Sequence, residues 1–113
     1  MWYSKPNSLL KDAIRSITGR LRMSQSLGSI ANDAVVDTGE NEPTGVLTVI
    51  NETDDEIAIW AVEGNTLIAI QVNTNFSDTL TTASKINVAF DTDQYKVENK
   101  LGSNKIVRFH FVA

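Results

Sequence analysis

The densest group of reactive side chains in this sequence is the segment NETDDE, residues 51–56, which places four carboxylates in five consecutive positions. Carboxylates gathered in this way could bind a metal ion, but the segment lacks the central glycine and the distant bidentate glutamate of the twelve-residue calcium loop. Asparagine, aspartate and threonine also favour turns, because their side chains bond to nearby backbone amides. The segment is therefore interpreted as a turn between two strands, and no metal ligand is assigned.

His110 is the only histidine, and it alternates with Arg108 and Val112 along the final apolar segment. This alternation places it on the outer face of a sheet. A catalytic triad would need a nucleophile and an acid converging on His110, and no glycine elbow surrounds any serine. The glycines also lie too far apart for a phosphate-binding fingerprint. We therefore expect no enzyme, no catalytic residue and no bound cofactor.

Trp60 could offer a flat surface on which a sugar stacks. Its neighbours on the same strand face, Ala58 and Val62, are apolar, which favours a buried or interface tryptophan. A lectin-like β module that binds carbohydrate through Trp60, Tyr95 or nearby acids is the alternative function that the sequence allows.

Two tripeptides, 51–53 and 75–77, match the acceptor pattern for N-linked glycosylation. Lys11, Asp12 and Arg15 interrupt the N-terminal apolar residues and so break any signal-peptide core. The apolar runs are also far shorter than the roughly 20 residues that cross a bilayer. We therefore expect a soluble chain without glycans and without a membrane partner.

The formal charge of −4 conceals an uneven distribution. Residues 1–22 hold five basic residues and one acid, a balance of +4, whereas residues 23–113 hold five basic and thirteen acidic residues, a balance of −8. So acidic a body repels phosphate, and we expect no nucleic-acid partner. The absence of cysteine excludes disulfide bonds and thiolate metal sites.

The stretch from residue 46 onward has the alternation and the β-branched residues of strands. Short polar connections separate them, which is typical of antiparallel pairing. The sequence predicts a mainly β domain over residues 46–113, an antiparallel β-sandwich or small barrel of about six strands. The expected strands are residues 46–50, 56–62, 67–73, 85–91, 94–100 and 105–112.

Two of these segments, EIAIWAV and LIAIQV, are apolar on both faces. Strands of this kind are either central in a sheet or meet another subunit with their outer face. Both interpretations stay open at the level of sequence.

Residues 8–21 have apolar positions at helical spacing, which predicts an N-terminal amphipathic helix. A helix this short is marginal in water and must dock on something. It could cover its own domain, anchor the chain to a partner protein or lie on a membrane surface. Residues 24–45 lack periodicity and are rich in Gly and small polar side chains, so residues 1–45 are predicted to be a helix followed by an extended arm.

The N-terminal segment also supplies the candidate partner-binding residues. Trp2 and Tyr3 have the amphipathic character favoured at interfaces, although they could equally fold back on the body. The candidates for partner binding are Trp2, Tyr3, Leu10, Ile14, Arg15, Ile17, Leu21 and Arg22.

The closing segment INVAFDTDQYKVENKLGSNKIVRFHFVA, residues 86–113, consists of a strand, a short turn, a strand with Asn99, Lys100 and Gly102 at its end, and a final strand. It resembles the terminal strands of small β-sandwich or barrel domains in virion proteins of tailed bacteriophages, where a strand of the type Y-K-V-x-N-K-x-G precedes the last one. The resemblance covers about the last quarter of the chain.

The resemblance implies a noncatalytic viral structural protein, either a capsid decoration (cement) protein or a small tail or neck component. Decoration proteins of this kind are often trimeric and bind the capsid lattice through an extended N-terminal arm. The implied partners are other virion proteins and further copies of the chain, and the implied location is the virion, assembled in the host cytoplasm. The predicted helix suits a tail or adaptor component better than a decoration protein.

Overall fold

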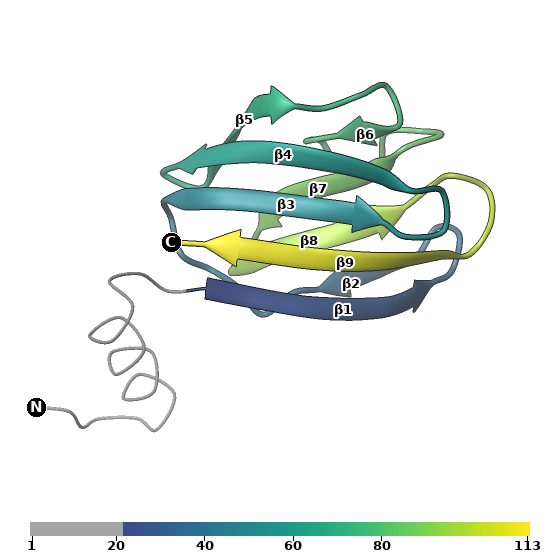
Figure 1. Cartoon of the computed structure of the whole chain (residues 1–113), viewed down its shortest axis with the longest axis horizontal. Coiled ribbons are helices and arrows are strands. Elements are labelled where there is room, and N and C mark those ends of the chain that lie inside the picture. The colour runs from purple at the N-terminus through teal and green to yellow at the C-terminus, as the bar shows by residue number, and fades with distance from the viewer. Residues whose placement is uncertain (1–21) are drawn as a thin grey trace, which may run out of the picture.

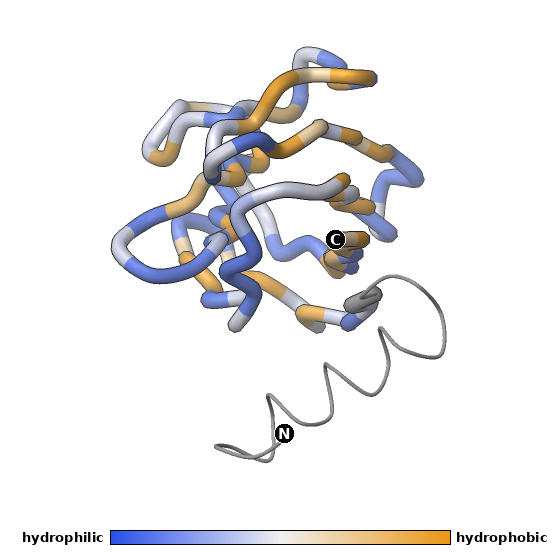
Figure 2. The backbone as a smooth tube through the Cα atoms, turned by 90° about the vertical axis from the view of Figure 1, so that its left-hand side faces the viewer, coloured by the Kyte–Doolittle hydropathy of each residue, from blue (hydrophilic) through white to orange (hydrophobic). Residues whose placement is uncertain are grey.

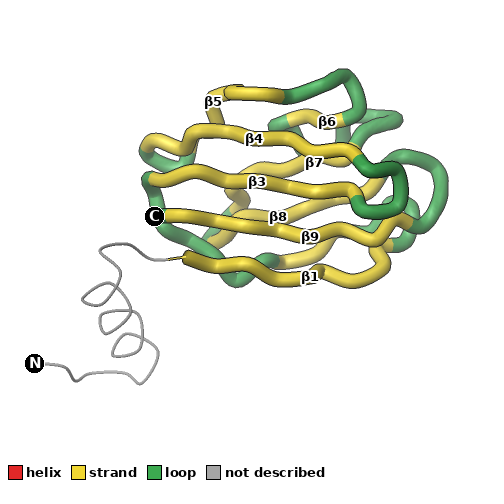
Figure 3. Tube along the Cα trace, viewed as in Figure 1, coloured by secondary structure: helices red, strands yellow, loops and turns green. Residues whose placement is uncertain are grey.

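The computed structural model describes residues 22–113, and this part of the chain folds into β-strands joined by loops (Figures 1 and 3). Within it no helix is long and apolar enough to span a membrane. The strands are β1 (Arg22–Ile30), β2 (Val35–Asp37), β3 (Gly45–Asn51), β4 (Glu56–Glu63), β5 (Thr66–Gln71), β6 (Phe76–Ser77), β7 (Ile86–Asp91), β8 (Gln94–Asn99) and β9 (Lys105–Val112).

The strands form two sheets that pack face to face (Figure 1). One sheet has five strands in the order β1-β9-β3-β4-β5, and the other has four in the order β2-β8-β7-β6. Neighbouring strands are antiparallel, except that β6 and β7 are parallel. The prediction of a mainly β domain is confirmed, and the two sheets form a sandwich rather than a closed barrel.

The core lies between the sheets and follows from the two-residue period of each strand. Along β9, for example, Val107, Phe109 and Phe111 are fully buried, while the residues between them are partly exposed. Figure 2 views the sandwich along its strands, with hydrophobic and hydrophilic residues alternating along the tube. The buried set is Ile30, Leu47, Val49, Ala58, Trp60, Val62, Phe76, Ile86, Val88, Tyr95, Val97, Val107, Phe109 and Phe111.

Tyr95 links the two sheets at one end of this core. Its ring lies 5.3 Å from that of Phe111 in the opposite sheet and 5.2 Å from that of Phe90 on β7. Its hydroxyl donates to the carbonyl oxygen of Glu42 at 2.6 Å and accepts from Asn65 Nδ2 at 3.1 Å. Burial raises the pKa of the Tyr95 phenol above its ordinary value. The residue therefore supplies apolar area to the core and a polar anchor for the segment before β3.

All six predicted strands are confirmed as β3, β4, β5, β7, β8 and β9. The predicted turn at residues 51–55 is confirmed as well, and short turns also join β4 to β5 and β7 to β8. The structure adds three strands that the sequence did not predict, namely β1, β2 and β6.

The predicted extended arm over residues 24–45 is corrected, because β1 and β2 are part of the sandwich. β1 pairs with β9 along its whole length, and Ile30 at its end is 1% exposed within the core. A bulge between Ser26 and Gly28 interrupts the alternation of β1, which hides its strand character in the sequence. The described sandwich therefore includes strands from residues 22–45 as well as those from residue 46 onward.

The placement of β4 and β5 tests the first interpretation of their apolar faces, namely that both strands are central in a sheet. β4 lies within the five-stranded sheet, but β5 lies at its edge and is therefore not central. The other interpretation, that an outer face meets another subunit, stays a prediction. The predicted helix over residues 8–21 lies outside the described residues.

Candidate functional site

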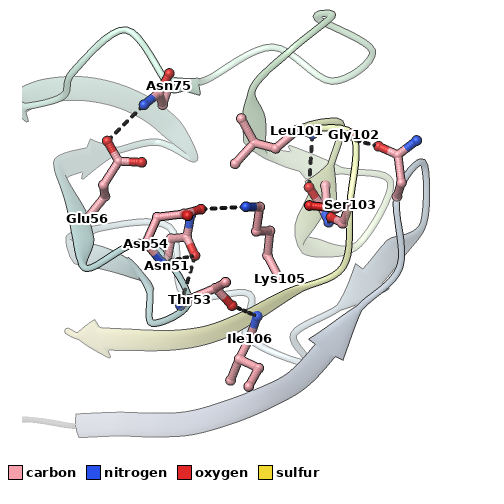
Figure 4. Close-up of polar contacts among 12 residues, drawn as sticks. Asn51, Thr53, Asp54, Glu56, Asn75, Leu101, Gly102, Ser103, Lys105 and Ile106 are labelled. Atoms are coloured by element: carbon pink, nitrogen blue, oxygen red, sulfur yellow. Dashed lines mark hydrogen bonds and ion pairs between the residues drawn. The ribbon is translucent and has the colours of Figure 1, made fainter.

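The acidic segment 51–56 forms the turn between β3 and β4 (Figure 4). The side chain of Asn51 is buried, and its Oδ1 accepts hydrogen bonds from the backbone N–H groups of Thr53 at 3.1 Å and Asp54 at 3.3 Å. Its Nδ2 donates to Asp54 Oδ2 at 2.8 Å. These bonds fold the turn in the way that asparagine favours. Because the Asn51 amide is buried and bonded, it is not presented as a glycan acceptor.

The carboxylates of this turn bind neighbouring parts of the fold. Lys105 Nζ lies 2.7 Å from Asp54 Oδ2, and Arg108 Nε lies 3.6 Å from Glu52 Oε1. The hydrogen bond from Lys105, together with that from Asn51, lowers the pKa of the Asp54 carboxyl. The turn is thus held against the start of β9.

Two further contacts complete this anchoring. Thr53 Oγ1 accepts from the backbone N–H of Ile106 at 2.8 Å (Figure 4). Glu56 Oε2 accepts from the side-chain amides of Asn73 at 3.1 Å and Asn75 at 2.8 Å. Among the described residues, no three acidic or histidine side chains gather as metal ligands would. The polar side chains of this turn therefore have a structural role, because they hold in place a strand and a loop that are distant in sequence.

The remaining candidate for chemistry, His110, lies on the outer face of the five-stranded sheet, as predicted. It is partly exposed, and its cross-strand neighbours are Ser24 on β1 and Thr48 on β3. The row continues to Ile59 on β4. His110 therefore belongs to a sheet surface and not to a cleft.

The two aromatic residues considered for sugar binding lie in the core. Trp60 is 1% exposed and packs edge-on against Phe76, with ring centroids 6.4 Å apart, and Tyr95 is fully buried. The predicted burial of Trp60 is confirmed. Neither ring presents a flat surface on which a sugar could stack.

The outer face of the five-stranded sheet carries most of the exposed large aliphatic side chains of the described residues. One cross-strand row runs from Val112 through Val46 and Ala61 to Ile68. Val46 is 40% exposed and Ile68 is 54% exposed. We call this surface the outer apolar face; its aliphatic residues are Val46, Ile50, Ile57, Ile59, Ala61, Ile68, Ile106 and Val112.

The outer face of the four-stranded sheet has the opposite character. Lys96 lies 3.3 Å from Asp91 and 3.7 Å from Asp37 across neighbouring strands. Glu98 is buried beneath the loop of residues 78–84, where its Oε1 accepts from the backbone N–H of Thr81 at 2.6 Å. This face is therefore polar and partly covered by its own chain, so the two outer faces of the sandwich are not equivalent.

An open hollow of about 640 Å³ lies at the side of the sandwich formed by β5 and β6. Apolar side chains and polar side chains of the connecting loop share its wall. The lining residues are Trp60, Ala69, Val72, Asn73, Thr74, Phe76, Ser77, Asp78 and Lys85.

The candidate partner-binding residues Trp2, Tyr3, Leu10, Ile14, Arg15, Ile17 and Leu21 lie outside the described residues. Arg22 is the first residue of β1, and its backbone pairs with Val112. Residues 1–21 are thus connected to the sheet beside the row of Val112, Val46, Ala61 and Ile68. The sequence did not single out these outer residues, although the apolar character of both faces of EIAIWAV was the signal for them.

Comparison with known proteins identifies no relative, because no family model, no curated protein and no solved structure matches the chain.

Proposed function

We propose that this protein is a noncatalytic structural component of a virion, in which the β-sandwich is attached to a capsid or tail assembly through the outer apolar face and the basic N-terminal segment. The observation that carries this proposal is the contrast between the two outer faces. One is aliphatic over neighbouring strands, and the other is polar and covered by the loop of residues 78–84.

Exposed aliphatic surface of this kind supports an assembly role. Isolated apolar residues are ordinary on protein surfaces, but contiguous apolar patches mark interaction sites. Burying apolar surface stabilises a contact by roughly 25 cal/mol per Å² removed from water. A partner that covers Val46, Ile57 and Ile68 together would gain from every one of these side chains.

The charge distribution also supports attachment through the N-terminal segment. Residues 1–22 have a net charge of +4 and residues 23–113 a net charge of −8. An acidic partner surface would therefore attract the N-terminal segment and repel the rest of the chain. Its link to β1 lies at the same end of the sheet as Val46 and Val112. The segment is therefore attached to the chain at one end of the row formed by Val112, Val46, Ala61 and Ile68.

A carbohydrate-binding role is less well supported. Shallow sugar sites depend on an exposed aromatic ring, and the rings named for that role, Trp60 and Tyr95, are both in the core. Among the described residues, the large apolar side chains that are exposed are all valine or isoleucine.

The test is incorporation into particles. The gene is deleted from the virus that carries it and supplied in trans, and the protein content of purified particles is measured by quantitative mass spectrometry. We expect the wild-type chain to be incorporated, and the variant Ile57→Lys, which places a charge on the outer apolar face, to be incorporated poorly.

Val35→Lys is the matched control, because Val35 is 48% exposed on β2 of the opposite sheet, whereas Ile57 is 38% exposed. It should be incorporated like the wild type, and circular dichroism should show both variants folded. Absence of the wild-type chain from purified particles would overturn the proposal. Equal incorporation of both variants would exclude the outer apolar face as the contact.

A further inference from the structure

β5 (Thr66–Gln71) is the uncharged edge of the five-stranded sheet. Its one partner among the described strands is β4, and apart from Leu67 its residues are exposed. Ile68 and Ile70 are 54% and 60% exposed. The chain carries no charged residue from Gly64 to Ser77, although a fifth of the whole sequence is charged. The longest run of uncharged residues in the sequence thus contains the strand at this edge of the sheet.

Soluble proteins protect such edges with charges, prolines, bulges or very short strands. The other three sheet edges have this protection. β1 contains a bulge between Ser26 and Gly28, in the middle of the strand, while β2 has three residues and β6 has two. β5 is longer than β2 and β6 and has neither charge nor proline. It also contains a bulge, but this lies at Ile70, near the end of the strand, so Thr66–Ala69 keep a regular register with β4.

We propose that β5 pairs antiparallel with β5 of a second copy of this chain, so that the two five-stranded sheets become one continuous sheet. An antiparallel pair of identical strands has two-fold symmetry, which makes the contact self-complementary. The exposed N–H and C=O groups of each strand supply the hydrogen bonds, as in other cases of strand addition.

Charge favours β5 over other surfaces as the contact between two copies of the chain. Residues 23–113 carry a balance of −8, so two bodies repel each other over most orientations. Pairing through β5 apposes only the uncharged residues of each copy. A contact in which Ile68 and Ile70 of both strands cluster also removes from water the two most exposed large apolar side chains of residues 24–113.

Continuity with neighbouring surfaces favours the same arrangement. The row of Val112, Val46, Ala61 and Ile68 ends at β5, and pairing across β5 would continue it into the corresponding row of the second copy. The open hollow beside Ala69 would lie along the new strand pair and be partly covered by it. A six-residue strand gives a contact at the small end of specific interfaces, so the association should depend on protein concentration.

The first test is the mass of the full chain in solution, measured by sedimentation equilibrium at increasing concentration. We expect the wild type to shift from 12.4 kDa to twice that mass. Ile68→Lys should remain at the single-chain mass, because it places two like charges near each other across the pair. Ile106→Lys is the matched control, since Ile106 is 48% exposed on β9, three strands away in the same sheet, and this variant should still pair.

Hydrogen exchange of the wild-type chain tests the edge itself, without any substitution. The backbone amides of β5 should become more protected as the concentration rises, while those of β1 at the opposite edge should not change. A wild type that stays at the single-chain mass would overturn the proposal. So would pairing that survives Ile68→Lys, or β5 amides whose protection does not depend on concentration.

This inference does not depend on the proposed function. Loss of pairing in Ile68→Lys is measured with purified protein, whereas the proposed function is measured by the incorporation of Ile57→Lys into particles. Either result can fail while the other stands.

Discussion

The side-chain nitrogen Nδ2 of Asn99 lies 2.8 Å from the carbonyl oxygen of Ile30, to which it donates a hydrogen bond that joins β8 to the end of β1 in the opposite sheet. The same nitrogen donates to the carbonyl oxygen of Ser103 at 2.7 Å, and Oδ1 accepts from the N–H of Leu101 at 3.0 Å. Asn99 is fully buried, so one side chain satisfies three backbone groups where the loop before β9 begins.

Asn99→Ala should therefore be among the most destabilising polar substitutions in this chain. It leaves buried backbone groups without a partner, each of which costs about 1–3 kcal/mol. The free energy of unfolding, measured by urea denaturation, should fall by about 2 kcal/mol or more. Asn104→Ala, at an exposed position of the same loop, should change it by less than about 0.5 kcal/mol. Equal effects of the two variants would contradict this role for Asn99.

Truncation should show that the sandwich begins at β1. Removal of residues 1–30 takes away Ile30, and loss of such a buried side chain alone costs about 2–5 kcal/mol, a large part of the usual stability of a domain. It also exposes the edge of β9. We expect this chain to lose its cooperative thermal transition in circular dichroism, whereas a chain that lacks only residues 1–21 should keep it. A cooperative transition in the chain that lacks residues 1–30 would show that β1 is dispensable.

Asp54→Asn should make the fold less stable in a pH-dependent manner. The Lys105 ammonium, together with the Asn51 amide, lowers the pKa of the Asp54 carboxyl below its ordinary value of 3.8. A folded-state pKa below the unfolded one gives stability that is fully present above pH 3.8 and is lost as the pH falls through the lowered pKa. The variant should therefore be less stable than the wild type at neutral pH and equal to it in strong acid.

Asp55→Asn is the control for that comparison, because Asp55 lies next in the same turn at a φ of 56°, which asparagine tolerates well. Urea denaturation across the acid range measures both variants. A difference between Asp54→Asn and the wild type that persisted unchanged in strong acid would contradict the ion pair as its cause.

Gly45→Ala should destabilise the fold by about 1–3 kcal/mol, because the added methyl group overpacks a closed site. A Cβ at residue 45 would collide with the carbonyl oxygen of Val112 and the ring of Phe111, and the backbone of β9 cannot move without disturbing its pairing with β3. Thermal melting measures the loss. Gly64→Ala, at a turn position with open space around it but a φ of 57°, separates this clash from the cost of a left-handed backbone.

The parts of this fold that the sequence predicts are those with unbroken alternation. β9 was predicted with its observed ends, since inward and outward residues alternate along all of Lys105–Val112. In β1, the bulge at Leu27 resets the pattern, and Gln25 occupies a position opposite buried Phe109, so no apolar face is visible in the sequence. β6 has only two residues and depends on its pairing with β7.

The position of β5 could not be predicted for a different reason. An apolar segment such as LIAIQV has the pattern of a strand that is covered on both faces. A strand at the edge of a sheet that binds another subunit has the same pattern. Only the pairing order distinguishes the two cases. The turn at residues 51–55 was predicted, but its bond to Ile106, more than 50 residues away, depends on contacts that no local pattern encodes.

The single free side of β5 also limits what can be built from it. β5 has one side available for pairing, and that side is occupied once two copies have joined. This contact therefore ends at a dimer and does not propagate into a fibre. It also cannot close a ring of three. If the chain forms trimers by another surface, each trimer would carry three such edges at its periphery, and β5 would then act as a cross-link between neighbouring trimers.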